Sequence, residues 1–356
     1  MVKRILQITL LIVLPFLLNA QINIMKHYTV EKGLANNEVY HVIQDSKGYM
    51  WFATNAGPCK YDGYSFTNYN IIDGISDNTT LALYEDYKGR IWFISISCKL
   101  NYFYNDSIYK YEYNDKIIES LSGSYLPIKN SFYVDSLDNV YLGISHKGIY
   151  KISKKGEIEI INQTTDKKLK NFVRYYDNET SIRYFSPYND SIEIYNNDTP
   201  KTITNIPGLA IPDIAISFIK KHPYDNGYFL SSKNNFYSFY KDKIESHKFK
   251  NRIIYFDIDK NNNIWLGQSQ NGIEKYSNAD ITKKTNHYLK GKSVSSFCID
   301  RENGTWFTTL YSGVYYLPKE QITSYKKNNG IPFSAVNTLE KNNNDLLIGS
   351  NKNTLF

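Results

Sequence analysis

Residues that build covalent scaffolds or active sites are scarce in this chain of 356 residues. It has three cysteines and six histidines, and the histidines share no common spacing. Three cysteines allow one disulfide at most, which excludes a disulfide-built scaffold. The sequence also lacks a Gly-rich phosphate-binding motif and a nucleophile paired with a base. These absences argue against an enzyme and predict that the chain needs no cofactor and no metal.

Charge and hydrophobicity exclude two further classes. The formal net charge is +7, from 42 basic and 35 acidic residues, and the lysines are scattered through polar segments. Nucleic-acid binding calls for a basic stripe with interleaved aromatic residues, and none is present, so we expect no nucleic-acid partner. Beyond the N-terminus the chain has no apolar run long enough for a membrane span.

The N-terminus has the pattern of a secretory signal over residues 1–20. Lys3 and Arg4 form its basic end, an apolar core of 14 residues follows, and cleavage is expected after Ala20. This core is short for a membrane span, and an uncleaved anchor is the alternative. Export places the cysteines in an oxidising compartment, where a Cys59–Cys98 disulfide is one option and free thiols are the other.

The chain is rich in tyrosine, with 33 residues, and it contains a sequence repeat that includes every tryptophan. The stretch "DSKGYMWFATNAG" begins at Asp45, and its acid precedes Trp51 by six residues. The same spacing separates the acid from the tryptophan at Trp92, Trp265 and Trp306. Weaker copies place other residues at this position, namely Tyr141, Arg183, Phe229 and Leu347. The mean step is about 42 residues, a period typical of propeller blades.

A second landmark keeps the same register. Gly33 and Gly74 each lie 18 residues before the next tryptophan, and Gly330 lies 17 before Leu347. Each repeat reads as four short strands, of which the first two are joined by a D-x-x-G turn. One antiparallel blade cannot bury both of its faces, so blades stack around an axis. The sequence therefore predicts an all-β propeller of four-stranded antiparallel blades, with the large aromatic residue packed between blades.

The D-x-x-G turn also has a metal-binding interpretation. "DKNNN" at 259–263 resembles the start of a calcium loop. Such a loop requires Gly at its sixth position and Glu at its twelfth, where this chain has Ile264 and Gln270. The aspartate is instead expected to accept backbone hydrogen bonds within the turn.

The number of blades depends on how the ring closes. We favour seven blades, with residues 21–320 as the propeller and 321–356 as an incomplete eighth repeat. The alternative is an eight-bladed ring in which the N-terminal segment 22–30 supplies the strand that the eighth repeat lacks. Closure matters because it removes exposed sheet edges.

Two segments, 28–63 and 73–93, resemble the two-component regulator propeller repeat: a glycine-led loop, a strand, D-x-x-G, then tryptophan and a small-residue turn. The resemblance extends over most of residues 22–356 and is faint in the fourth and fifth copies. It implies the periplasmic sensor region of a bacterial sensor histidine kinase or hybrid two-component system, which senses carbohydrates in many cases. The chain lacks the β-sandwich, membrane helix and kinase of that plan and stops within a repeat, which favours a fragment of a longer, membrane-anchored parent.

The function expected from these observations is non-catalytic sensing of a small glycan or another extracellular ligand. A stand-alone interaction scaffold, including a homodimer, is the alternative, and a propeller glycosidase or lyase is a third class. The candidate ligand site is the face opposite the D-x-x-G turns, because its inter-blade loops and second turns carry more varied polar residues. Its candidate residues are Asn37, Asn55, Asn78, His146, Gln270 and Tyr311.

Overall fold

The computed structural model contains two compact units, which are described separately. The larger is Met25–Leu317, and the smaller contributes a single described hairpin. Residues 1–20, with the expected signal, lie outside the described part of the chain. The structure describes residues 25–123, 125–145, 147–161, 173–178, 181–188, 191–196, 199–203, 216–224, 227–240, 243–319, 336–342 and 345–350.

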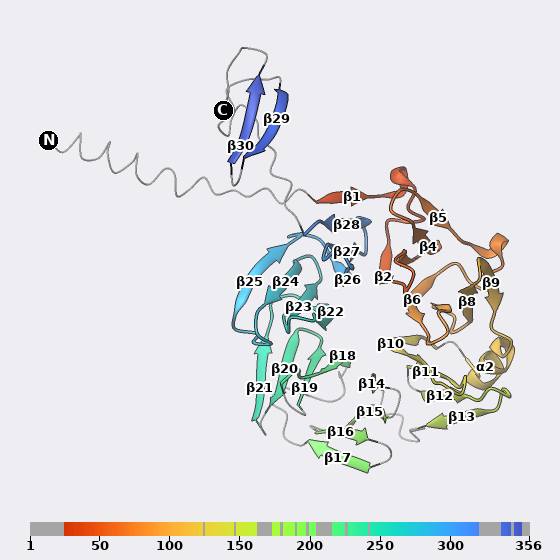
Figure 1. Cartoon of the computed structure of the whole chain (residues 1–356). Coiled ribbons are helices and arrows are strands. Elements are labelled where there is room, and N and C mark those ends of the chain that lie inside the picture. Colours follow the sequence, from red (N-terminus) through yellow and green to blue (C-terminus); the bar gives the residue numbers. More distant parts are fainter. Residues whose placement is uncertain are drawn as a thin grey trace. The chain divides into compact units, whose positions relative to one another are not determined.

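The strands of the larger unit pair into four-stranded antiparallel sheets (Figure 1). Blade 1 consists of β2 (Val39–Gln44), β3 (Met50–Thr54), β4 (Gly57–Tyr61) and β5 (Phe66–Asn68). Blade 2 consists of β6 (Thr80–Glu85), β7 (Ile91–Ser95), β8 (Leu100–Tyr104) and β9 (Ser107–Lys110). Blade 3 consists of β10 (Pro127–Val134), β11 (Val140–Ile144), β12 (Gly148–Ile152) and β13 (Ile158–Ile161).

Four further sheets complete the series. Blade 4, described by its backbone only, consists of β14 (Val173–Asn178), β15 (Ser181–Tyr188), β16 (Ser191–Asn196) and β17 (Thr199–Ile203). Blade 5 consists of β18 (Ile216–Lys221), β19 (Tyr228–Ser232), β20 (Asn235–Tyr240) and β21 (Lys243–Lys248). Blade 6 consists of β22 (Ile253–Ile258), β23 (Ile264–Gln268), β24 (Gly272–Tyr276) and β25 (Lys284–Tyr288). Blade 7 consists of β26 (Val294–Ile299), β27 (Thr305–Thr309), β28 (Val314–Leu317) and β1 (Lys26–Tyr28).

The first strands of these sheets form the inner wall of a ring. Each contacts the first strand of the next sheet, from β2 through β6, β10, β14, β18 and β22 to β26, and β26 contacts β2 (Figure 1). The prediction of an all-β propeller with four-stranded antiparallel blades is confirmed. Six blades have described side chains, and the seventh four-stranded sheet is blade 4.

Helical structure among the described residues is limited to short connections. Helix α2 (Asn114–Leu121) joins blades 2 and 3, and the 3-10 turns η2 (Val30–Lys32) and η3 (Ile71–Asp73) precede blades 1 and 2. In the described part, no helix has the length and apolar character needed to cross a membrane.

The N-terminal strand β1 closes the ring through blade 7. It pairs antiparallel with β28, with Tyr28 opposite Val314, and the Tyr28 ring stacks 5.6 Å from Trp306. The eight-bladed alternative is wrong in this respect, because it assigned the N-terminal segment to the eighth repeat. In the described residues of that repeat, β29 (Val336–Asn342) pairs with β30 (Asp345–Ser350) as a two-stranded sheet of its own.

Each D-x-x-G turn is held by its aspartate. One oxygen of Asp45 accepts hydrogen bonds from the backbone N–H groups of Lys47 at 3.0 Å and Tyr49 at 2.8 Å. The other accepts the indole N–H of Trp51 at 2.8 Å. The indole N–H groups of the other three tryptophans bond equally to Asp86, Asp259 and Asp300, at 2.8, 2.8 and 2.9 Å.

The spacing of six residues therefore has a structural role, because it lets each aspartate tie its turn to the tryptophan side chain. We call this arrangement of aspartate, turn and tryptophan the bracket. At the suspected calcium turn, Asp259 accepts the backbone N–H groups of Asn261 and Asn263, both at 2.9 Å. The carboxylate that would ligate a metal is thus committed to the turn and to its tryptophan.

All four tryptophans lie between blades, as predicted. Trp51 of blade 1 packs on Phe93 and Phe103 of blade 2, with ring centroids 5.7 and 5.0 Å apart. Trp92 of blade 2 packs on Phe132 of blade 3 at 5.4 Å.

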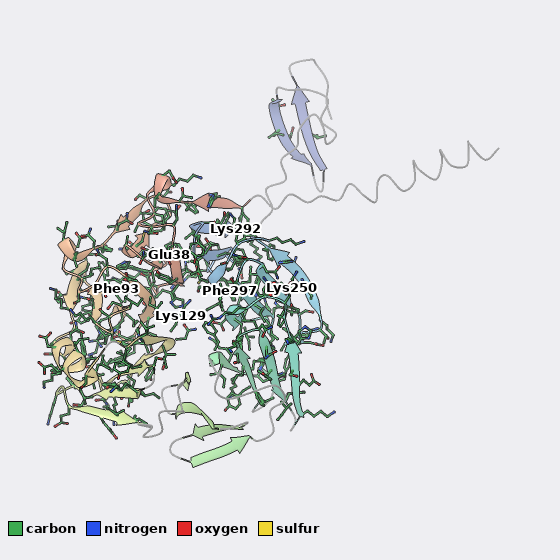
Figure 2. All side chains as sticks on the ribbon, turned by 180° about the vertical axis from the view of Figure 1, so that it is seen from behind. Glu38, Phe93, Lys129, Lys250, Lys292 and Phe297 are labelled. Atoms are coloured by element: carbon green, nitrogen blue, oxygen red, sulfur yellow. The ribbon has the colours of Figure 1, made fainter. Side chains whose placement is uncertain are left out.

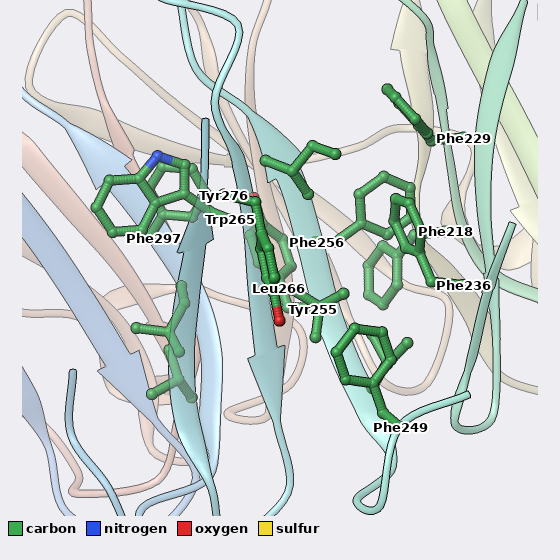
Figure 3. Packing of buried hydrophobic residues seen from close by; sticks show 14 of the residues in the cluster. Phe218, Phe229, Phe236, Phe249, Tyr255, Phe256, Trp265, Leu266, Tyr276 and Phe297 are labelled. Carbon is green, nitrogen blue, oxygen red and sulfur yellow. The ribbon is translucent and has the colours of Figure 1, made fainter. Parts of the chain in front are cut away.

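The other two tryptophans repeat this contact. Trp265 of blade 6 lies 5.1 Å from Phe297 of blade 7 (Figure 3). Trp306 of blade 7 lies 5.7 Å from Phe52 of blade 1. Burial of these rings between sheets makes a hydrophobic contribution to ring assembly.

The cysteines are free thiols. Cys59 and Cys98 are both buried but belong to different hydrophobic clusters, so the disulfide considered from the sequence is absent. Burial raises the pKa of each of these thiols to about 12, which favours the protonated form.

Candidate functional site

The two faces of the ring are formed by different turns of the blades. The D-x-x-G turns follow the first strands and define one face. The second turns lie on the other, because the backbone N–H of Asn55 bonds to Glu38 O at 3.1 Å, and that of Leu310 bonds to Ser293 O at 3.0 Å. Glu38 and Ser293 immediately precede the first strands of blades 1 and 7. We call this side, with the second turns and the starts of the first strands, the loop face.

Two of the predicted site residues anchor the loop face. The side-chain oxygen of Asn37 accepts the backbone N–H of Val30 at 3.1 Å, and that of Asn78 accepts the backbone N–H of Ile71 at 3.0 Å. The two amides occupy equivalent positions and fix the 3-10 turns η2 and η3. Their side chains therefore have a structural role, and their contact with a ligand stays a prediction.

Three others lie in second turns. Asn55 is exposed and its side-chain oxygen accepts the Thr79 hydroxyl at 3.1 Å, which links blade 1 to blade 2. Gln270 is exposed and has a left-handed backbone with φ of 54°. Tyr311 is 75% exposed. His146 lies outside the described residues.

One predicted residue, Tyr311, lies close to the first strand of blade 1. It acts electrostatically on Tyr40 of β2, whose hydroxyl is hydrogen-bonded to Glu38. Burial and this carboxylate raise the pKa of Tyr40. The structure thus brings Tyr311, Tyr40 and Glu38 together where blades 7 and 1 meet the loop face.

Sequence reasoning missed a second set of polar residues, on the axis. The first strands of blades 1, 2, 5, 6 and 7 each contain one unpaired residue near their start, where the pairing register shifts. In blade 1 this residue is Tyr40, and in blade 7 it is Ser295. A bulge takes its residue out of the ladder, so its carbonyl is free to accept another partner.

Blade 3 has a larger bulge than the others. Between the pairs Pro127↔Ile144 and Phe132↔Leu142, four residues of β10 face only Gly143 of β11. Asn130 in this bulge has a left-handed backbone with φ of 66°. Gly143 is required here, since a Cβ at this position would lie 2.0 Å from the Ser131 Oγ.

The enlarged bulge carries Lys129 across the axis. Its ammonium donates to the carbonyl of Tyr40 at 2.5 Å and to that of Ser295 at 2.7 Å, both of which are bulge residues of other blades. It also lies 5.1 Å from the centre of the Tyr255 ring in blade 6. Figure 2 places Lys129 on the inner side of the ring. Burial lowers the pKa of this lysine to about 7.

His41 lies beside this ammonium. Its Nδ1 accepts the backbone N–H of Leu83 at 3.2 Å, which leaves the proton of the neutral ring on Nε2. Burial lowers the pKa of His41 well below its usual value, and the nearby charges of Lys129 and Lys220 lower it further. The ring is therefore neutral and presents an N–H donor.

One described carboxylate balances the cluster. Asp257 of β22 accepts the ammonium of Lys220 at 2.9 Å and the hydroxyl of Tyr255 at 3.2 Å. The side chains of Lys220 and Asp257 are 24% and 28% exposed, so solvent reaches this part of the axis. We call Lys129, His41, Lys220, Asp257 and Tyr255 the axial cluster.

The sequence contains one indirect indication that blade 3 differs from the other blades. The step from Trp92 to Tyr141 is 49 residues, whereas Trp51 and Trp92 are 41 apart. Helix α2 and the enlarged bulge of β10 take up the extra length. Among the described residues, no group of three or more His, Cys, Asp and Glu side chains is placed to hold a metal ion.

Comparison with known proteins agrees with this architecture. Residues 33–56 match the family described as two component regulator propeller. A comparison with curated protein sequences found no match.

Several solved structures share the fold. The extracellular domain of BT3049, described as a hybrid two component system of B. thetaiotaomicron, aligns with a TM-score of 0.65 and 18% identity over 91% of this chain and 46% of that one. The extracellular domain of BT4673, described in the same way, aligns at 0.63 and 15% identity over 85% and 44%. Virginiamycin B lyase from Staphylococcus aureus aligns at 0.60 and 13% identity over 83% and 99%.

The chain spans less than half the length of the two extracellular domains that it resembles. At these identities the likeness establishes the fold alone. The tryptophan spacing, the closed ring and the match at residues 33–56 identify this chain as a propeller that carries a two component regulator propeller repeat.

Proposed function

We propose that this chain is an exported, non-catalytic sensory propeller that belongs to a two-component signalling protein and binds an extracellular ligand on its loop face. The observation that carries the proposal is the two component regulator propeller repeat at residues 33–56 within a fold shared with extracellular domains of hybrid two component systems. The basic, then apolar pattern of residues 1–20 supports export to the periplasm.

The ligand class we propose for the loop face is a small glycan. Exposed tyrosine and amide side chains suit sugars, because rings stack on apolar sugar faces while amides exchange hydrogen bonds with hydroxyls. Tyr311 and Asn55 have this character and lie in second turns of neighbouring blades 7 and 1. Gln270 supplies a further exposed amide in blade 6.

The test is titration calorimetry against a panel of neutral and acidic oligosaccharides. Replacing Asn55, His146 and Tyr311 together with alanine should weaken binding at least about tenfold, as expected for loss of one stacking contact and several hydrogen bonds. The unfolding midpoint should stay unchanged, because the Asn55 and Tyr311 side chains are exposed.

Two controls lie on the D-x-x-G face. Tyr64, in the β4–β5 turn, is 96% exposed and matches Tyr311 in chemistry, so Tyr64→Ala should leave glycan binding unchanged. Substitution of Lys47 and Lys88 in the D-x-x-G turns should also leave it unchanged. Loss of binding in these controls, with none in the triple variant, would place the ligand on the opposite face.

A lyase is the second candidate, favoured by the likeness to virginiamycin B lyase over 83% of this chain. Incubation of the protein with a streptogramin B antibiotic, followed by mass spectrometry, tests it. An opened product would replace the sensory proposal with a catalytic one. A ligand-free, tight homodimer that binds no glycan would instead favour the interaction scaffold.

A further inference from the structure

We propose that the axial cluster is a binding site for a small oxyanion, such as the carboxylate of an acidic ligand, held by Lys129, Lys220 and His41. This site is distinct from the second turns of the loop face and does not depend on their binding a glycan. Three observations support it: the nearness of the Lys129 and Lys220 charges to His41, the imbalance of charge among the described residues and the departure of blade 3 from the repeat.

The donors come from three blades that are not neighbours in the ring. His41 lies on β2, Lys129 on β10 and Lys220 on β18. An ammonium has three N–H donors, and Lys129 uses two on the carbonyls of Tyr40 and Ser295. His41 adds its Nε2–H, since Nδ1 is occupied by the Leu83 N–H.

The charges of the cluster do not cancel among the residues whose side chains the structure describes. Two ammonium groups face one described carboxylate, Asp257, which is paired with Lys220. Lys129 is bonded to neutral carbonyls only among the described residues, and burial disfavours its charged form. A bound anion would compensate this charge and favour the protonated amine.

The groups around Lys129 come from several elements. His41 and Tyr40 belong to β2, Lys220 to β18, and Tyr255 and Asp257 to β22. Strand β14 also contacts β10, and its backbone alone is described. On the other neighbouring strand, β6, the carboxylate of Glu85 is bonded to the backbone N–H of Ser46 in the D-x-x-G turn of blade 1.

The backbone around Lys129 departs from the regular geometry of the other blades. A regular blade places one residue in its bulge, whereas blade 3 places four opposite Gly143. Asn130 adopts a left-handed backbone, and the buried Ser131 hydroxyl has no hydrogen-bond partner in the described structure. Enlarged bulges and unsatisfied buried groups carry a stability cost and are typical of functional positions.

The experiment uses four probes with the whole chain: D-glucuronate, its neutral counterpart D-glucose, sodium acetate and inorganic phosphate. Calorimetric titration at pH 6.5 should detect binding of at least one oxyanion and none of glucose. Binding of glucuronate alone would identify the ligand group as a carboxylate carried on a sugar. Binding of acetate would identify it as a free carboxylate, and binding of phosphate would identify it as a free inorganic anion. Absence of binding by all three anions overturns the proposal.

Lys129→Met should weaken binding of the anion by about tenfold or more, as for loss of a charge-assisted hydrogen bond. Lys250→Met removes the same charge from an exposed position and should leave binding unchanged. Equal weakening in both variants would reveal a general charge effect and refute the site.

Two further variants keep the test decisive if Lys129→Met does not fold. Binding to the wild type should weaken as pH rises from 6.5 to 8.5, because Lys129 loses its proton, whereas Lys129→Arg should bind with little pH dependence. His41→Asn retains an acceptor for the Leu83 N–H while removing the Nε2–H, and should weaken binding about fivefold. An unchanged affinity in folded His41→Asn, together with an unaltered pH profile in Lys129→Arg, would contradict the assignment. Failure of glycan binding at the loop face would leave these results unaffected.

Discussion

Replacing Asp45 by asparagine tests the bracket that repeats around the ring. Asparagine keeps one oxygen for the backbone N–H groups of Lys47 and Tyr49. Its amide N–H₂ then stands where the second oxygen of Asp45 accepts the Trp51 indole N–H at 2.8 Å. Two donors would face one another in a buried position, since Asp45 is 5% exposed and Trp51 is fully buried.

The expected loss of unfolding free energy is about 2–4 kcal/mol. A hydrogen bond to a charged group contributes about 1.5–3 kcal/mol, and an unsatisfied buried donor costs about 1–3 kcal/mol, with partial overlap between the two. Urea denaturation followed by tryptophan fluorescence measures this loss. In a Trp51→Phe background the indole N–H is gone, so Asp45→Asn should cost at least about 1.5 kcal/mol less than in the wild type.

Asp62→Asn is the matched control. Asp62 is exposed and accepts the backbone N–H groups of Tyr64 and Ser65, at 2.8 and 2.7 Å, without an indole partner. Its substitution should leave the unfolding midpoint unchanged. If Asp45→Asn cost the same with and without the Trp51 indole, the bracket would have no energetic role and the reasoning would fail.

Three further changes test the ring and its axis. Trp92→Ala should lower the unfolding free energy by about 3–5 kcal/mol in urea denaturation, because a buried ring between blades 2 and 3 is lost; an unchanged midpoint would contradict the packing role. Removal of residues 25–29 exposes the edge of β28 and should produce aggregation on size-exclusion chromatography, whereas a monodisperse, equally stable product would show that β1 does not close the ring. Burial lowers the pKa of Lys129 from 10.5 to about 7, so the unfolded state binds more protons above pH 7 and stability should rise with pH. The rise in urea denaturation should be roughly 1.5 kcal/mol between pH 7 and 8.5 and should be absent in Lys129→Met.

The blades could be predicted from sequence because their determinants are local. Asp45 and Trp51 lie six residues apart and belong to one turn and the strand after it, so each copy repeats the same spacing. The position of each tryptophan between blades also follows, because a large ring on a two-sided sheet is buried only by a neighbouring sheet. The indole-to-carboxylate bond required the structure, since spacing alone does not show that the ring turns its N–H back to the turn.

Ring closure could not be predicted because it is non-local. The segment at His27 was recognised as an outer strand, but the sequence offered it to the incomplete eighth repeat, whereas it pairs with β28 of blade 7. Its partner Tyr315 is nearly a whole chain away, and the pairing is decided by the geometry of the closed ring. The loop-face residues were chosen for polarity, which does not show that Asn37 and Asn78 hold backbone N–H groups.

The axial cluster lies where the repeat is broken rather than where it is kept. Seven identical first strands would present bulge carbonyls to the axis, as Tyr40 and Ser295 do, and such a wall has no positive charge of its own. The larger bulge in blade 3 inserts Lys129 into this wall, with His41 and Lys220 beside it. A brace that only tied blades together could use a neutral donor and would avoid the desolvation cost of a half-buried ammonium. Because propellers owe their different functions to such local departures from a shared scaffold, this departure at the axis is the reason we propose the axial cluster, rather than a regular part of the ring, as the anion site.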